Sequence, residues 1–207
     1  MTLKKLTLST FLFALSTSVI ADEITPPGFY IGAGYGSFGY DTEEDWNNST
    51  EYGVLIEETN GHSLKLYGGY QFNKVIAVEA TYTDYGNTQG YVNTTSGLAS
   101  VKQSPTSFSL AANLGYSFKN GIRPFGLIGL SATTLNSSYA FLEDDNITAI
   151  KIGLGVEFSP RQLHGIQFRL AYESDAYFAQ EKVSTYNSDN LYIFTLDSFY
   201  AGVSYKF

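Results

Sequence analysis

Apolar and polar residues alternate along eight segments of this 207-residue chain. In the segment 106–118, for example, Phe108, Leu110 and Leu114 alternate with small or polar residues. Successive side chains of a β-strand point to opposite faces, so a period of two predicts strands with one apolar face. The pattern in 122–133 is less regular and leaves its two faces unassigned. The segments are 29–39, 63–72, 75–85, 106–118, 122–133, 147–158, 165–174 and 198–207.

The links between these segments alternate in length. Short links follow the second, fourth and sixth segments, whereas long polar links follow the first, third, fifth and seventh. If neighbouring strands are antiparallel, all short links lie at one end of the sheet and all long links at the other. This order predicts an all-β fold, an eight-stranded antiparallel up-and-down barrel. Its long links are 40–62, 86–105, 135–146 and 175–197.

Alternation alone does not say which face points outward. A soluble barrel that carries an apolar ligand would turn its apolar face inward and show the same pattern. Here the less apolar face is crowded with Gly, Ala and Ser, whereas a ligand cavity would be lined by larger apolar groups. Aromatic residues also recur near segment ends, as they do where a barrel crosses the membrane interfaces. We therefore expect a transmembrane barrel whose apolar face contacts lipid.

The last segment supports this orientation. Phe199, Val203, Tyr205 and Phe207 share one face, and the sequence ends on that aromatic residue. This ending is typical of bacterial outer-membrane barrels, so Tyr205 and Phe207 are the expected signal for the barrel-assembly machinery.

The first 21 residues have the features of a secretory signal peptide. Lys4 and Lys5 precede a short apolar run, and Ala21 ends a motif of small or modest residues. The run is shorter than the roughly 20 apolar residues of a spanning helix. We expect cleavage after residue 21 and a mature barrel domain over 22–207 in the outer membrane. An uncleaved helical anchor is the alternative.

Composition and charge narrow the possibilities further. The chain holds 17 Tyr, 15 Phe and 20 Gly but no Cys. Aromatic residues suit strands and membrane interfaces, and glycine suits a tightly packed barrel interior. The absence of cysteine excludes a lipoprotein anchor, disulfides and thiolate metal sites. A net charge of −8 argues against nucleic-acid binding.

Several motifs resemble the transmembrane domain of the outer membrane protein A family. The stretch from Leu66 to Glu79, with 82–86 after it, is similar to the second hairpin of that domain. The stretch 202–207 is similar to its closing strand. Three other stretches are similar to its later strands, namely 110–118, 155–158 and 168–172.

The resemblance implies charged residues inside the barrel, with a glutamate on the third strand near basic partners. Glu79, Glu157 and Arg169 match such positions, whereas Asn113 stands where the family commonly has a lysine. A pairing switch that uses that lysine is therefore not expected. Family members often continue into a periplasmic peptidoglycan-binding domain. This sequence ends with the barrel, so we do not expect tethering to the cell wall.

By strand parity, seven charged residues face the interior of the expected barrel. An eight-stranded barrel is just wide enough for side chains to fill it, and an unpaired buried charge is very costly. We therefore expect these residues to pair into a network that plugs the lumen. A path for ions or small solutes, gated by Glu79 and Arg169, is the alternative. The residues are Lys65, Glu79, Lys151, Glu157, Arg169, Glu173 and Lys206.

The long links are rich in acidic residues. Solvated loops are commonly polar, and their charge opposes aggregation. A functional alternative is that two acidic runs share divalent cations with lipopolysaccharide, because Ca²⁺ and Mg²⁺ prefer oxygen ligands. The same links are the candidate contacts for host or other cell-surface ligands. The two runs are Asp41, Glu43, Glu44 and Asp45, and Glu143, Asp144 and Asp145.

Catalysis has little support in the sequence. His62 is expected in a long link and His164 in a short one, so the two cannot form one triad or one metal site. The dipeptide His62-Ser63 leaves a lipid A-modifying enzyme as a third alternative. We expect no catalytic residues, no cofactor and no metal. The expected function is structural, with support of the envelope and presentation of surface loops.

Overall fold

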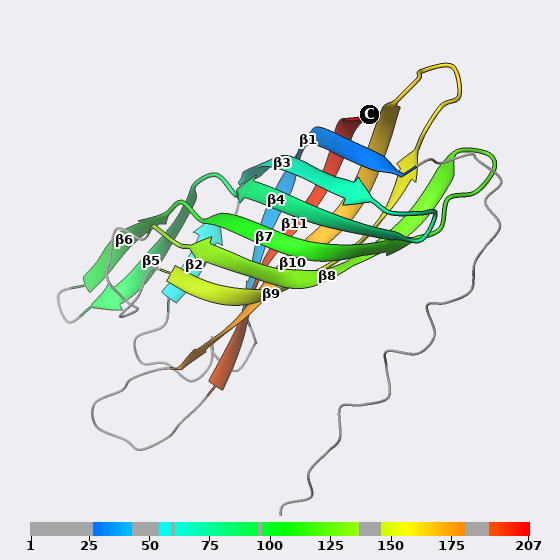
Figure 1. Ribbon diagram of the computed structural model, residues 1–207. Helices are drawn as coiled ribbons and strands as arrows, with labels where there is room; N and C mark the ends of the chain where they lie inside the picture. The colour runs from blue at the N-terminus through cyan, green and yellow to red at the C-terminus, as the bar shows by residue number, and fades with distance from the viewer. Residues whose placement is uncertain (1–26, 43–53, 59–60, 95–96, 137–145, 181–190) are drawn as a thin grey trace, which may run out of the picture.

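The computed structural model describes residues 27–42, 54–58, 61–94, 97–136, 146–180 and 191–207. Eleven strands form in these residues (Figure 1). No helix that could cross a membrane occurs in this part of the chain. The strands are β1 (Gly28–Thr42), β2 (Val54–Glu58), β3 (His62–Gln71), β4 (Ile76–Asp84), β5 (Thr88–Thr94), β6 (Gly97–Gln103), β7 (Thr106–Gly115), β8 (Ile122–Thr134), β9 (Asn146–Phe158), β10 (Ile166–Gln180) and β11 (Leu191–Lys206).

Eight of these strands close into one antiparallel barrel in the order β1-β11-β10-β9-β8-β7-β4-β3. The first and last strands pair directly, with Tyr30 opposite Lys206 and Thr42 opposite Phe194. The closure leaves the barrel without a free sheet edge. This matters in a membrane because lipid offers no hydrogen-bond partners to backbone groups at an open edge. The expected eight-stranded barrel is thereby confirmed.

The long links contain structure that the alternation did not predict. β2, β5 and β6 form a separate three-stranded sheet from the links 40–62 and 86–105. Figure 1 shows this sheet beyond one end of the barrel. β10 and β11 also continue past the predicted segments, to Gln180 and from Leu191, so they occupy much of the expected link 175–197. The predicted signal peptide lies outside the described residues.

The two faces of the barrel differ as the alternation predicts. Large apolar side chains cover the outside, where Phe29 and Leu154 are each 66% exposed. Inside, two tyrosine rings lie against the bare backbone of β1. A side chain at Gly32 would begin 2.6 Å from the Tyr67 ring, and one at Gly34 would begin 2.5 Å from the Tyr200 ring. Glycine on the inner face of β1 therefore makes room for these rings.

The structure also assigns the faces of the irregular segment. In β8, Arg123, Phe125 and Leu127 are buried inside the barrel, whereas Ile128 and Leu130 are exposed outside. Because two large apolar residues point inward, both faces of β8 have apolar side chains. The alternation was unreadable for that reason.

Paired aromatic rings mark the end of the barrel where the short links lie. Tyr116 and Phe118 are in edge contact at 5.0 Å, and Tyr205 and Phe207 are at 5.1 Å. A third pair, Tyr70 with Phe72, has the same geometry. These rings form the belt that membrane barrels place at a lipid interface.

Candidate functional site: the charged barrel interior

Arg169 occupies the centre of the barrel interior. Its Nη2 atom lies 2.6 Å from an oxygen of Glu79 and 2.6 Å from an oxygen of Glu157. The other guanidinium nitrogens also donate to these two carboxylates, at 2.8 Å and 3.1 Å. The guanidinium lies over the ring of Tyr67, with its carbon 4.1 Å from the ring centroid. One cation on β10 thus joins β4 to β9 across the lumen.

Both carboxylates have further partners. Glu157 accepts a hydrogen bond from Arg123 on β8 at 3.0 Å. Glu79 accepts one from the Tyr30 hydroxyl at 2.7 Å and one from the Asn113 amide at 3.3 Å. Charge-assisted bonds of this kind are roughly twice as strong as neutral ones. The position where a lysine is familiar in the resembled family is therefore filled by a neutral donor to Glu79.

A second group of charges lies nearer the long links. Glu173 accepts from Lys65 at 2.9 Å and from Lys151 at 3.0 Å. Lys151 also contacts Asp175 at 3.4 Å. The Tyr200 hydroxyl donates to Glu173 and accepts from Arg169 at 3.3 Å. Through Tyr200, the two groups form one continuous network.

Asp175 anchors the outer end of this network. It accepts hydrogen bonds from Tyr85, Ser107 and Ser131, on three different segments. Tyr85 follows the end of β4 and is fully buried. Asp175 therefore ties β7, β8 and the residue after β4 together at this end of the network.

The charges of the network balance. Four carboxylates face four cations, and every one of these residues is at most 5% exposed. Six of the seven residues expected inside the barrel belong to it. Lys206, the seventh, lies apart and donates to the side-chain oxygen of Gln71 at 2.7 Å. The members are Glu79, Glu157, Glu173 and Asp175, with Lys65, Arg123, Lys151 and Arg169.

Sequence reasoning missed two members of the network. Asp175 was counted in the long link 175–197, but β10 continues through it and buries it. It lies two residues after Glu173, so extending the parity of that strand would have found it. Arg123 was missed because the alternation in 122–133 left the two faces of that segment unassigned. Its partner Glu157 lies directly opposite it in the β8–β9 register.

The remaining sequence candidates lie elsewhere. Tyr205, on the outer face of β11, and Phe207, directly after that strand, are both exposed, and their role as an assembly signal stays a prediction. Asp41 belongs to β1, although its side chain is not described. The other acidic residues of the two runs, namely Glu43, Glu44, Asp45, Glu143, Asp144 and Asp145, lie outside the described residues.

The dipeptide His62-Ser63 cannot act as a catalytic pair. His62 is the first residue of β3 rather than part of a loop, which corrects the expectation. It is exposed and stacks on Tyr35 at 5.4 Å between ring centroids. Ser63 is buried on the opposite face, with its hydroxyl 2.6 Å from that of Ser198. Within the described ranges, no group of three His, Cys, Asp or Glu side chains could hold a metal ion.

Solved structures of known proteins share this fold. The neisserial surface protein A matches with a TM-score of 0.59 and 14% identity, over 88% of this chain and 100% of that one. OprG from Pseudomonas aeruginosa matches with a TM-score of 0.53 and 17% identity, over 87% and 96%. Ail, the attachment invasion locus protein of Yersinia pestis, matches with a TM-score of 0.51 and 15% identity, over 88% and 100%. At these identities the likeness concerns the fold alone.

No curated protein sequence matches the chain. A family model does match it, over residues 7–207, and describes an outer membrane protein β-barrel domain. That match covers all eight barrel strands, including the closing pair β1–β11. The chain therefore belongs to the outer membrane protein β-barrel domain family.

Proposed function

We propose that this protein is a closed structural barrel that supports the envelope and presents its long links for contacts at the cell surface. The balanced charge network carries the proposal. An ion that passed through the lumen would have to separate Arg169 from Glu79 and Glu157, three residues that are at most 5% exposed. Separating a buried pair strands a charge, at a cost of about 3–5 kcal/mol.

A second barrier lies toward the long links. Seven buried apolar and aromatic residues pack together there, in front of the Asp175 end of the network. Tyr177 stacks on Phe194 at 5.4 Å, and Phe38 contacts Tyr85 at 5.0 Å. Such a cluster excludes water and opposes the entry of ions. Its members are Phe38, Tyr85, Leu135, Ala149, Tyr177, Phe194 and Leu196.

Conductance measurements test the closed barrel. Purified protein in a planar bilayer is expected to give no steady single-channel steps, with an unrelated porin in the same bilayer as the positive control. Steady steps from the wild type that change in Arg169→Ala would contradict the proposal. They would favour the alternative of a narrow channel through the network.

The surface role rests on the long links and on the similar proteins. The described part of the links 40–62 and 86–105 builds a sheet beyond the barrel, so the chain carries an ordered platform there (Figure 1). Two similar structures are named as a surface protein and an attachment protein, and Ail was also solved with a heparin analogue. We extend a surface-contact role to this chain, with its own ligand still to be identified.

Loop deletion tests this role. Bacteria that display a variant lacking residues 43–60 are expected to adhere less to a cultured epithelial cell layer than bacteria that display the wild type. Heat-modifiable migration on a gel would verify that the variant barrel is folded. A variant lacking residues 137–145, which contribute no strand to the β2-β5-β6 sheet, shows whether the loss of adhesion is specific to the link that carries β2. Unchanged adhesion after both deletions are combined would refute the surface role.

A further inference from the structure

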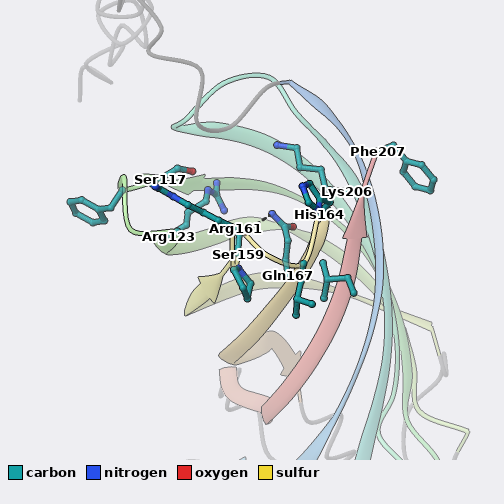
Figure 2. A pocket seen from close by; sticks show the side chains of 14 residues that line it. Ser117, Arg123, Ser159, Arg161, His164, Gln167, Lys206 and Phe207 are labelled. Atoms are coloured by element: carbon teal, nitrogen blue, oxygen red, sulfur yellow. Dashed lines mark hydrogen bonds between the residues drawn. The ribbon is translucent and has the colours of Figure 1, made fainter.

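The mouth of the barrel at the short links contains a basic pocket. Its volume is ≈ 280 Å³, and it lies between the ends of β8, β10 and β11 and the turn before β10. Figure 2 shows Arg123, Arg161, His164 and Lys206 gathered around this opening, with the ring of Phe207 turned away from them. None of the functions considered above uses this pocket.

Two buried polar atoms at the pocket have no hydrogen-bond partner among the described residues. One is Nε of Arg123, whose side chain bonds Glu157 through Nη1 and is 4% exposed as a residue. The other is the hydroxyl of Ser117. A buried donor without an acceptor is costly, because nothing replaces the hydrogen bonds that it would make with water. Two such groups in one pocket indicate that an acceptor from outside the chain completes them.

The pocket also carries positive charge that the barrel does not neutralise. Deeper in the lumen, four cations are matched by four carboxylates. At the mouth, Lys206 donates to the neutral Gln71 amide and Arg161 to the backbone oxygen of Lys119. Neither forms an ion pair with any described residue. The acceptor is therefore expected to be an anion.

We propose that this pocket binds a phosphate group. A phosphate offers several acceptor oxygens around one centre, which matches an arginine N–H, a lysine ammonium and a serine hydroxyl better than a single carboxylate would. The pocket is also bordered by Phe118 and Phe207, both exposed at the aromatic belt, so it lies at the level of lipid headgroups. Phosphate could reach it from a phospholipid headgroup or from the aqueous side. The chemistry of recognition is the same.

Binding of inorganic phosphate to the purified barrel in maltoside detergent, which lacks phosphate, tests the proposal directly. Calorimetry is expected to show saturable binding to the wild type. The double variant Arg161→Gln/Lys206→Gln should bind about tenfold more weakly or worse, because it removes two charged donors. The matched control is Lys74→Gln, which removes a cation from another short link outside the pocket. It should bind like the wild type.

A second variant tests the buried donor without disturbing the balance of charge. Arg123→Lys keeps a cation beside Glu157 but removes Nε, so weaker phosphate binding is expected, with circular dichroism used to verify that the variant barrel is folded. The source of the phosphate is distinguished with nanodiscs of phosphatidylglycerol. Protection of Lys206 from amine-reactive labelling by this lipid, and not by inorganic phosphate, identifies a headgroup site. Protection by inorganic phosphate identifies a site open to soluble phosphate.

Either result supports a phosphate site. The proposal fails if neither form of phosphate binds saturably, or if the double variant and Lys74→Gln bind equally well. Because none of these measurements involves conductance or adhesion, they stand or fall separately from the closed barrel and its surface role.

Discussion

Arg169 shows how a single buried side chain can hold a barrel interior together. Its guanidinium contacts two carboxylates on strands that are not neighbours in the sequence, and it lies over the aromatic ring of Tyr67. The cation compensates the buried charge of both carboxylates, and the two carboxylates compensate the buried charge of the cation. Removing one member therefore costs more than the bond that is lost, because the charge that remains is still buried.

Replacing Glu79 tests this dependence. Glu79→Ala is expected to lower the free energy of unfolding by about 3–5 kcal/mol, since it leaves Arg169 with half of its carboxylate partners and leaves Tyr30 without an acceptor. Urea titration of the refolded barrel in lipid vesicles measures the change. Glu79→Gln, which keeps the shape and one acceptor oxygen, should cost less. A midpoint identical to that of the wild type would show that the network adds no stability.

At the scale of the element, β1 combines two different surfaces in one strand. Its inner face carries glycines at positions 32 and 34, against which Tyr67 and Tyr200 lie. Its outer face carries Ile31, Ala33 and Tyr35, all exposed toward lipid. Added side-chain volume should therefore destabilise the barrel on the inner face of this strand and have little effect on the outer face.

Adding a branched side chain to each face of β1 measures this difference. Gly34→Val is expected to destabilise the barrel by about 1–3 kcal/mol, because its Cβ would lie 2.5 Å from the Tyr200 ring. Ala33→Val is the matched control and should change the unfolding free energy little, because the added methyl groups enter lipid. The free energy of unfolding of each variant is measured by urea titration, with circular dichroism as the signal. Equal losses at the two positions would show that the inner packing has been misjudged.

For the whole molecule, the essential property is the orientation of the two faces. The closed barrel hides its charges in the lumen and exposes Leu, Ile, Val and Phe on the outside, which suits lipid and not water. A protein with this exterior needs the membrane for its stability. Family membership agrees with that orientation.

A charge on the outer face tests the orientation. Leu114→Arg is expected to cost about 1–2 kcal/mol, because Leu114 faces lipid but lies only two residues before Tyr116 of the interface belt, and the cost of a charge falls from the middle of the bilayer toward its interfaces. Leu114 is 47% exposed on the outside of β7, so the arginine would enter lipid rather than a protein contact. Gln162→Arg, in the exposed turn before β10, introduces the same side chain into water and should cost almost nothing. Equal unfolding free energies would mean that Leu114 does not face lipid.

Assembly in the cell is a separate property of the whole chain. Phe207 is 74% exposed and contacts the Tyr205 ring at 5.1 Å. Phe207→Ala should therefore change the unfolding free energy of refolded protein by only about 1 kcal/mol. If Phe207 belongs to the assembly signal, the same variant should leave less folded barrel in the outer membrane, as measured by heat-modifiable migration. Wild-type amounts would dismiss that role.

The amino-acid sequence by itself determined the eight barrel strands, the two faces of all of them except β8, and the alternation of short and long links. Strand parity is a local property, because each side chain points away from its neighbours whatever the strand pairs with. Lys65, Glu79 and Arg169 could therefore be placed inside the barrel from position alone. At β8 the alternation of apolar and polar residues could not be read, because Phe125 and Leu127 point inward and both faces of the strand are apolar.

Only the tertiary structure decided which charges meet. Arg169 and Glu79 are 90 residues apart, and they touch because barrel closure and strand register bring β10 and β4 to face each other across one narrow lumen. The same closure buries Asp175 beside Lys151 and leaves Lys206 at the mouth with a neutral partner. Contacts of this kind depend on the positions of all eight strands together, and no local pattern records them.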